Sequence, residues 1–397
     1  MSHIKRARLL SKELSDIRRD FHRHPELSFQ EVRTAEVVAG ILEDLGYRTR
    51  RGVGVTGVVG DLENGDGPVV ALRADMDALP IQEVGDHDYL SSVPGVMHAC
   101  GHDAHMAGLL GAARLAAQDR SEGNLPPGTL RLLFQPSEER ADDEGKSGAT
   151  RMVEDGAMEG VSAVAGLHVG GHLPAGKVFV KEGAIMAGCD DLQVMVRGRS
   201  AHAALPHEGV DALVLAAQGI MGVQQVVSRH LSPMENGVVT FGQIRGGVAP
   251  NVVPEEVQLD GTLRYFDPEV RKRLHEGVQG AFTALEALGG TVQVDIRKGY
   301  PPVINHPEIT RIAREVAVEV VGEDDVWAAE PMMGAEDFAI LAREAPGAFL
   351  WVGAALPDAR EHHNPRFDID ESVLPIQAAL LARTAMVLME RYRSAAP

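Results

Sequence analysis

The sequence of 397 residues contains few cysteines, few aromatic residues and little positive charge. Its two cysteines, Cys100 and Cys189, could form at most one bridge, which excludes a disulfide framework and favours a reducing cytoplasm. The 38 lysines and arginines stand against 57 aspartates and glutamates, so the net charge is −19. This balance disfavours binding to nucleic acid, because such binding depends on a basic face.

Long apolar runs are also missing. No run approaches the ~20 residues of a membrane-spanning helix, and residues 1–10 lack the apolar stretch of a secretory signal. We therefore predict a cytoplasmic protein that does not bind membranes. Hydrophobic residues make up 44% of the chain and charged residues 24%, which is typical of a folded globular protein, and the length favours two domains.

Three short apolar runs in the N-terminal half each end in polar residues that could carry chemistry. They are Val69–Leu72, which leads to Asp77, Leu130–Phe134, which leads to Glu138 and Glu139, and Val161–Leu167, which leads to His168. Continuous apolar runs are typical of buried parallel strands, and ligands of open α/β sheets bind beyond the carboxyl ends of such strands. We therefore predict an α/β fold with a functional site at these ends.

The pattern changes between about residues 185 and 300, where strand-like runs surround two long helix-like runs. We predict that residues 1–184 and 301–397 form one discontinuous α/β domain, and that residues 185–300 form an inserted α+β domain. Two local patterns predict individual turns and helix ends. Residues 64–67 predict a hairpin turn between two strands, and Ser28 to Glu31 matches a capping box at the start of a helix.

The densest group of polar residues lies between His98 and His105 and includes Cys100, His102 and Asp103. Cysteine and histidine are good ligands for zinc-like ions, and the Cys-x-His spacing brings two donors within reach of one site. The alternative is a buried free thiol beside surface histidines. Three histidines, a cysteine and an aspartate in one short loop favour the metal site.

Glu138 and Glu139 are adjacent, so their side chains point in different directions along an extended chain. One carboxylate could bind a metal while the other transfers a proton, and the alternative is a solvated acidic loop. His168 alone would be interpreted as a core histidine, and His363 as an exposed loop residue. Taken together with Cys100, these donors suit one or two divalent transition ions.

One dinucleotide-like motif is rejected. Gly52 to Gly57 matches G-x-G-x-x-G, but a strand-like run follows it, whereas that motif must open a helix. In the insert, His202 lies near small residues and a proline, Asn251 lies in a Gly/Pro-rich turn, and Arg264 ends a strand-like run. These three could face a substrate, with Asn251 or Arg264 binding a carboxylate. The alternative is ordinary turn chemistry.

In this order, the motifs resemble the metal-dependent aminoacylase and carboxypeptidase superfamily, and most closely its amidohydrolase branch of hippurate hydrolases, indoleacetyl-amino-acid hydrolases and N-acetyldiaminopimelate deacetylases. The most specific stretches are Cys100 to Asp103 and Gln135 to Glu139. The resemblance implies a mixed-sheet, metallopeptidase-like catalytic domain with an inserted lid. It also implies cleavage of N-acyl amino acids and a homodimer or homotetramer formed through the lid.

The resemblance also implies roles for individual residues. Two divalent ions, of manganese, zinc, cobalt or nickel, would be bound by five ligands, which are Cys100, His102, Glu139, His168 and His363. Glu138 would be the general base, and Asp77 would orient a ligand. His202 and Asn251, with Arg264 as a further candidate, would reach the substrate from the lid.

Two departures from the family pattern stand out. Residues 140–146 form an acidic stretch where relatives have a shorter Gly-rich link, and Ser200 and Ala201 replace a more usual Gly-Gly. Two other functions stay open. One is a metallo-aminopeptidase or dipeptidase on the same scaffold, and the other is a non-catalytic metal-binding relative.

Overall fold

The computed structural model describes residues 1–358 and 360–393. Contacts divide the chain into two compact units. The first contains Met1–Ile185, Val303–Glu330 and Asp337–Pro397, and the second contains Met186–Pro302 and Pro331–Glu336. The second unit therefore includes a short segment, 331–336, that the sequence assigned to the first domain.

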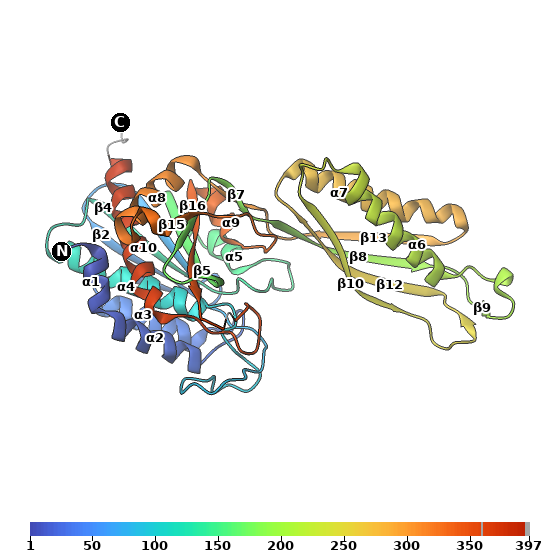
Figure 1. The fold of residues 1–397 in the computed structure, drawn as a ribbon, viewed down its shortest axis with the longest axis horizontal. Coiled ribbons are helices and arrows are strands. Elements are labelled where there is room, and N and C mark those ends of the chain that lie inside the picture. The colour runs from blue at the N-terminus through green and yellow to red at the C-terminus, as the bar shows by residue number, and fades with distance from the viewer. Residues whose placement is uncertain (359, 394–397) are drawn as a thin grey trace. The chain divides into compact units, whose positions relative to one another are not determined.

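The first unit is built on an eight-stranded sheet (Figure 1). In sheet order its strands are β1 (Arg48–Val53), β2 (Gly57–Asn64), β4 (Gly128–Gln135), β3 (Val69–Asp75), β5 (Val161–Pro174), β16 (Gly347–Ala355), β6 (Val178–Val180) and β15 (Val326–Ala328). Strands β4, β3, β5 and β16 run parallel to one another, while β1 and β2 are antiparallel. The sheet is therefore mixed, and the predicted α/β class is confirmed.

The predicted hairpin at residues 64–67 is wrong. Strand β2 pairs with β4, and β3 also pairs with β4, so β4 lies between the two strands that the turn was expected to join. The G-x-G-x-x-G motif instead lies at the turn between β1 and β2, which are antiparallel neighbours. The turn residues were correctly recognised, but they end one strand and begin another that is not its neighbour.

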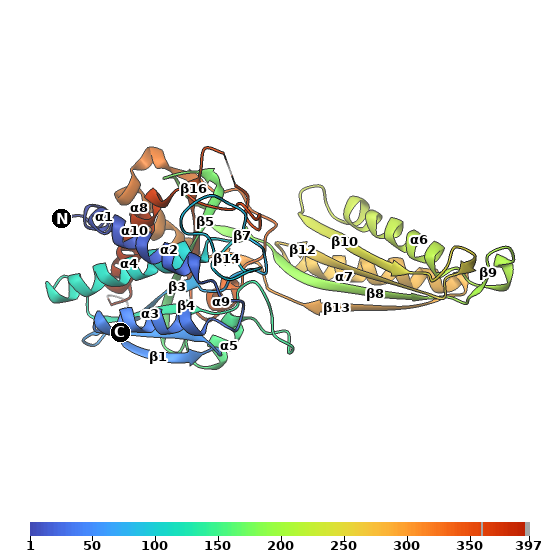
Figure 2. The ribbon, with the colours of Figure 1, turned by 90° about the horizontal axis from the view of Figure 1, so that it is seen from below.

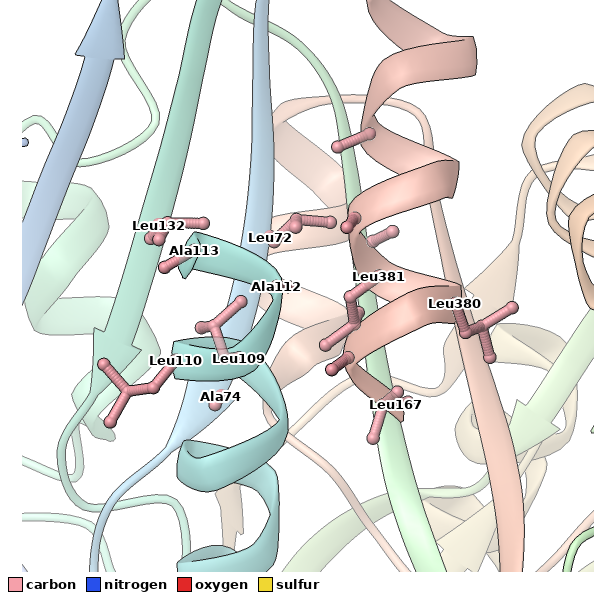
Figure 3. Packing of buried hydrophobic residues seen from close by; sticks show 14 of the residues in the cluster. Leu72, Ala74, Leu109, Leu110, Ala112, Ala113, Leu132, Leu167, Leu380 and Leu381 are labelled. Carbon is pink, nitrogen blue, oxygen red and sulfur yellow. The ribbon is translucent and has the colours of Figure 1, made fainter. Parts of the chain in front are cut away.

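Helices α4 (His102–Ser121) and α10 (Leu374–Arg393) pack side by side on one face of this sheet. Figure 3 shows Leu72 and Ala74 of β3, Leu132 of β4 and Leu167 of β5 pointing toward the two helices. Helix α3 (Val32–Asp44) contacts β1 and β2 farther along the sheet, and Figure 2 shows it beside β1. The N-terminal helices α1 (His3–Leu9) and α2 (Ser11–Arg23) and the later α8 (Pro307–Val321) complete this layer.

Helix α10 is more apolar than the sequence analysis allowed. Together with the turn before it, at residues 371–393, it is long and apolar enough to cross a membrane by length and composition alone. In the folded chain, 78% of its most apolar window is buried, against α4, α8 and the sheet. This burial is that of a core helix.

Two shorter helices, α5 (Gly148–Glu154) and α9 (Phe338–Glu344), contact each other beside the sheet. Because side chains alternate along a strand, Arg73 of β3 points away from the layer that Leu72 and Ala74 face. It reaches Asp337, the residue that precedes α9, so α5 and α9 cover the opposite face.

The expected capping box before α3 is absent from the described residues, although the helix itself is present. The side chain of Ser28 donates to Asp77 instead, at 2.7 Å, and the carboxylate of Glu31 accepts from the backbone N–H of Ser137. Both residues of the pattern are thus bound to segments far away in the chain.

The second unit contains a four-stranded antiparallel sheet with two helices on one face. Its sheet order is β10 (Gly237–Gly246), β12 (Glu256–Tyr265), β8 (Gly188–Arg197) and β13 (Thr291–Lys298), and its helices are α6 (Ala212–Gln225) and α7 (Pro268–Thr283). Figure 2 shows β10 and β13 at opposite edges. A small ladder of β9 (Ala201–His202) and β11 (Val252–Val253) lies beyond the end of β8.

Candidate metal centre

The polar residues at the strand ends of the first unit come together. Asp77 follows β3, His168 lies in β5 level with the end of β3, and Glu138 and Glu139 follow β4. Cys100 lies just before α4, and His102 is the first residue of that helix. All five predicted ligands therefore belong to one unit, although His363 is almost 200 residues from His168.

The donors form two groups that share Cys100. One group is Cys100, His102 and His168, and the other is Cys100, Glu139 and His363, and within each group the donor atoms lie within 4.8 Å of one another. The Sγ atom of Cys100 is 3.4 Å from Nε2 of His168, and Nε2 of His363 is 3.1 Å from Oε1 of Glu139. Thiolate, imidazole and carboxylate donors grouped in this way fit one or two divalent transition ions.

Backbone carbonyls orient two of the imidazoles. Nδ1 of His102 donates to the carbonyl oxygen of Asp77 at 2.9 Å, and Nδ1 of His168 donates to that of Val169 at 2.7 Å. A proton held on Nδ1 leaves the lone pair of Nε2 facing the other donors. This outer hydrogen bond is the usual support of a metal-binding histidine.

The cluster carries the charge that a cation requires. Nε2 of His102 is buried and has no hydrogen-bond partner among residues 1–358 and 360–393. Burial would lower the pKa of His102, but the nearby Asp75 and Asp77 outweigh burial and raise it to about 10. Burial, Glu139 and Glu138 raise the pKa of the Cys100 thiol. Without a cation this site attracts protons, so the residues fit a divalent metal.

Asp77 holds the loop that carries the two glutamates. Its Oδ1 accepts the backbone N–H of Glu138 at 3.1 Å, and its Oδ2 accepts that of Glu139 at 3.0 Å. The hydroxyl of Ser28 donates to the same Oδ2. The Glu138 side chain is 6% exposed and lies in a donor group with His102 and Glu139. Asp77 was expected to orient one metal ligand, and here it binds the backbone of both glutamates.

Beneath the site lies a buried network that the predictions from the sequence did not include. Arg73 donates to Asp75 at 2.7 Å, to Gln135 at 2.8 Å and to Asp337 at 2.9 Å. Asp75 also binds Nδ1 of His105 at 2.6 Å, and Nε2 of His105 accepts the backbone N–H of Val169. The spacing of Asp75 and Asp77, which puts two carboxylates on one side at a strand end, was the available signal.

The acidic stretch at residues 140–146 forms a turn that is held by its own hydrogen bonds. Asp142 accepts the backbone N–H groups of Glu144 and Lys146, at 2.9 and 3.0 Å, and its other oxygen pairs with Arg151 of α5. The backbone N–H of Gly148 then returns to the carbonyl of Ser137 at 2.9 Å. This turn ties the stretch to the loop of Glu138, and the charges of Asp142, Glu144 and Lys146 are paired with each other or with α5.

The second unit brings two of its three predicted residues together. His202 pairs with Val252 in the β9–β11 ladder, and the carbonyl of Asn251 accepts the backbone N–H of Ala203. His202 is exposed, and its Nδ1 accepts a backbone N–H at 3.0 Å, which leaves its Nε2–H outward as a donor. Arg264 lies near the far end of β12, opposite Cys189 of β8.

A profile of peptidase family M20/M25/M40 matches residues 71–387, which include all five predicted ligands and Glu138. The chain belongs to peptidase family M20/M25/M40. It is a hydrolase that acts on amide bonds, as expected from the resemblance.

Relatives within the M20 family share most of the chain's length. N-acetylcysteine deacetylase of Bacillus subtilis is 38% identical over 380 residues, which cover 95% of this chain and 97% of the relative. IAA-amino acid hydrolase ILR1-like 4 of Arabidopsis thaliana is 38% identical over 93% of this chain and 84% of its own. A crystal structure of a dinuclear metal-binding M20 peptidase from Bacillus subtilis superimposes with a TM-score of 0.83 at 34% identity, covering 96% and 99% of the two chains.

Proposed function

We propose that this M20 hydrolase cleaves N-acyl amino acids to a carboxylic acid and a free amino acid, with two divalent ions bound in the donor cluster. The observation that carries the proposal is the pair of donor groups that share Cys100, with the buried Glu138 beside them. The deacetylase and the amino acid hydrolase among the relatives support the substrate class by their names.

The ligands in this proposal are Cys100, His102, Glu139, His168 and His363. When bound there, manganese, zinc, cobalt or nickel ions would lower the pKa of a water molecule and polarise an amide carbonyl. Glu138 takes the proton of that water as general base and later delivers it to the leaving amine. Asp77 keeps Glu138 in place through the backbone N–H bonds of the loop.

His202 and Asn251 supply the substrate contacts in this proposal. The outward Nε2–H of His202 suits donation to the oxygen that gains negative charge during attack. Asn251 lies beside His202 in the same ladder region, whereas Arg264 lies at the other end of the sheet, near the start of β8. We therefore assign the amino-acid carboxylate to Asn251 before Arg264.

A hydrolysis panel tests this function. The purified chain, loaded with Mn²⁺ or Zn²⁺, is given N-acetyl and N-benzoyl amino acids and unblocked dipeptides, each with and without a chelator. We expect release of free amino acid from the acylated compounds and loss of that release with the chelator. Faster turnover of dipeptides would favour the peptidase alternative. Metal binding without turnover of any compound would favour a non-catalytic relative.

We also propose that two copies assemble through the second unit. Strand β10 is a sheet edge, and an edge strand presents unpaired backbone groups to another chain. Val214 and Met221 of α6 and Ile244 of β10 are large apolar residues that are more than half exposed. Light scattering on the wild type and on Met221→Lys tests this assembly. A monomeric wild type would contradict it.

A further inference from the structure

Glu31 is a buried carboxylate that the proposed mechanism does not use. Its side chain is fully shielded from solvent. Oε1 accepts two backbone N–H groups, that of Phe29 at 3.0 Å and that of Ser137 at 2.8 Å. Oε2 accepts the hydroxyl of Thr56 at 2.5 Å. Glu31 thus connects the segment before α3 to the β1–β2 turn and to the loop after β4.

The residue that Glu31 holds has an unusual backbone. Ser137 has a φ of +46°, in the left-handed region that non-glycine residues rarely adopt. Its carbonyl accepts from Gly148, and its hydroxyl donates to the carbonyl of Arg140 at 2.6 Å. Such a conformation is unfavourable for a non-glycine residue and persists only where the surroundings enforce it. The Glu31 contact is one of the bonds that enforce it.

Three successive backbone N–H groups of this loop end on two carboxylates. The N–H of Ser137 ends on Glu31, and those of Glu138 and Glu139 end on Asp77. The first bond sets the direction in which the chain leaves Pro136, and the other two set the directions of the glutamate side chains. Loss of the first bond would let the peptide between Pro136 and Ser137 rotate, and this would shift the backbone that leads to Glu138.

We propose that Glu31 is a positioning residue, whose carboxylate sets the orientation of Glu138 and Glu139 through the N–H of Ser137. The expected effect of Glu31 on turnover rests on the proposed function. The effect of Glu31 on the proposed metal ligand Glu139 can be measured separately. A role in helix capping does not account for Glu31, because its side chain makes no capping bond to α3 within the described residues.

The negative charge of Glu31 does not account for its presence either. Burial and the nearby Asp77 raise its pKa to about 7, so the carboxylate is kept in surroundings that disfavour its charge. An apolar side chain would avoid this cost, but it could not accept the N–H of Ser137. The contact itself is therefore what this position provides.

Two conservative variants separate length from charge. Glu31→Gln keeps the length and an accepting oxygen, and it loses the charge. Glu31→Asp keeps the charge, but it is one carbon too short to reach Ser137. We expect Glu31→Gln to retain kcat within about threefold, and Glu31→Asp to lose about tenfold or more in kcat with little change in KM, as for a misplaced catalytic group.

Asp119→Asn is the matched control. Asp119 is also a buried carboxylate with two partners, His3 and Arg6, but it lies near the far end of α4, about 25 Å from His102 at 1.5 Å per residue. It should lower the melting temperature while kcat stays at the wild-type value. If Glu31→Asp behaves like this control, or if Glu31→Gln is the more damaged variant, the inference is wrong.

The cobalt-loaded protein gives a measurement that does not depend on turnover. We expect the visible absorption spectrum of bound Co²⁺ to change in Glu31→Asp, because Glu139 is displaced, and to stay unchanged in Glu31→Gln and Asp119→Asn. If the wild type hydrolyses no compound of the panel, the proposed function fails and this spectrum alone decides the inference. Identical spectra and cobalt affinities in all four proteins would overturn it.

Discussion

Cys100 is the residue on which the donor cluster depends most, because it belongs to both groups. Burial, Glu139 and Glu138 raise the pKa of its thiol, so the protein alone does not favour the thiolate. A metal ligand must nevertheless be deprotonated. Metal binding should therefore release a proton from Cys100, and metal affinity should rise with pH.

Replacement of Glu138 by glutamine tests the proposed base. The amide has nearly the same shape but cannot accept the proton of the attacking water. We expect kcat to fall by about 10²–10⁴, while elemental analysis finds the same metal content as in the wild type. Turnover within a few-fold of the wild type would remove Glu138 from this role.

His22 provides a prediction about pH. It lies outside the metal centre, between Asp103 at 2.8 Å and Glu83 at 3.0 Å. Burial lowers its pKa, but the two hydrogen bonds outweigh burial and raise it from 6.5 to about 9. A raised pKa means that the folded state holds this proton more tightly. The resulting stability is complete below pH 6.5 and is lost as pH rises through about 9.

The measurement compares the wild type with His22→Gln in urea unfolding from pH 6 to pH 9.5. We expect the wild type to be more stable by about 3 kcal/mol at pH 6, and this advantage to shrink as the pH rises through 9. Parallel stability curves for the two proteins across this range would contradict the prediction.

At the scale of elements, local signals located the strands but not their neighbours. The runs at 69–72, 130–134 and 161–167 lie in parallel strands, as predicted. They could be recognised because continuous apolar sequence is typical of strands buried on both faces. The turn at 64–67 carried no information about β4, which is more than 60 residues farther on and yet lies between β2 and β3. Strand order is decided by packing of the whole sheet, which no local pattern contains.

The candidate site could be predicted from local patterns, whereas the strand order could not. Candidate metal ligands are Cys, His, Asp or Glu, so residue type and spacing pointed to Cys100 and to the pair Glu138 and Glu139, and the resemblance implied which glutamate would bind a metal. Positioning residues have no such chemical mark. Glu31 matched a capping box, and only its contact with Ser137 reveals where its carboxylate acts.

Two glycines in helices of the first unit give a paired prediction. A Cβ added at Gly111 of α4 would lie 2.7 Å from the Cβ of Ala378 in α10 and 2.9 Å from Leu14 in α2. Gly111→Ala should therefore destabilise the protein by about 1–3 kcal/mol through overpacking. At Gly40 of α3, no described atom lies within 4 Å of an added Cβ. Gly40→Ala should stabilise by about 0.5–1 kcal/mol.

Denaturant unfolding measures both changes against the same wild type. The two substitutions add the same methyl group to a helix, so their difference isolates the close contact between α4, α2 and α10. Equal effects of the two substitutions would mean that the helices separate enough to admit a methyl group.

At the scale of the whole molecule, the metal centre and the fold of the first unit depend on each other. Residues 186–302 interrupt this unit between His168 and His363, yet both histidines belong to the donor cluster. The net charge of −19 adds to the repulsion among the carboxylates gathered at the strand ends. Bound cations should therefore stabilise the folded chain as well as enable turnover.

Removal of metal tests this dependence. At a free metal concentration 100 times its Kd, binding contributes about 2.7 kcal/mol, which corresponds to roughly 5 °C in Tm for a unit of this size. We expect a chelator to lower Tm by about this amount and Mn²⁺ or Zn²⁺ to restore it. In Cys100→Ala the effect of the chelator should be much smaller. An unchanged wild-type Tm would show that the cluster does not bind the ions tightly.

The packing of α10 on α4 has a consequence for synthesis of the chain. About 250 residues separate the end of α4 from the start of α10. At the usual rate of synthesis, 5–20 residues per second, roughly 12–50 s pass between the emergence of α4 from the ribosome and that of α10. The apolar side of α4 stays exposed during this time. A nascent chain of this protein therefore exposes an apolar surface for a long time. A product that ends before Leu374 would keep this surface exposed and should be bound by chaperones or degraded.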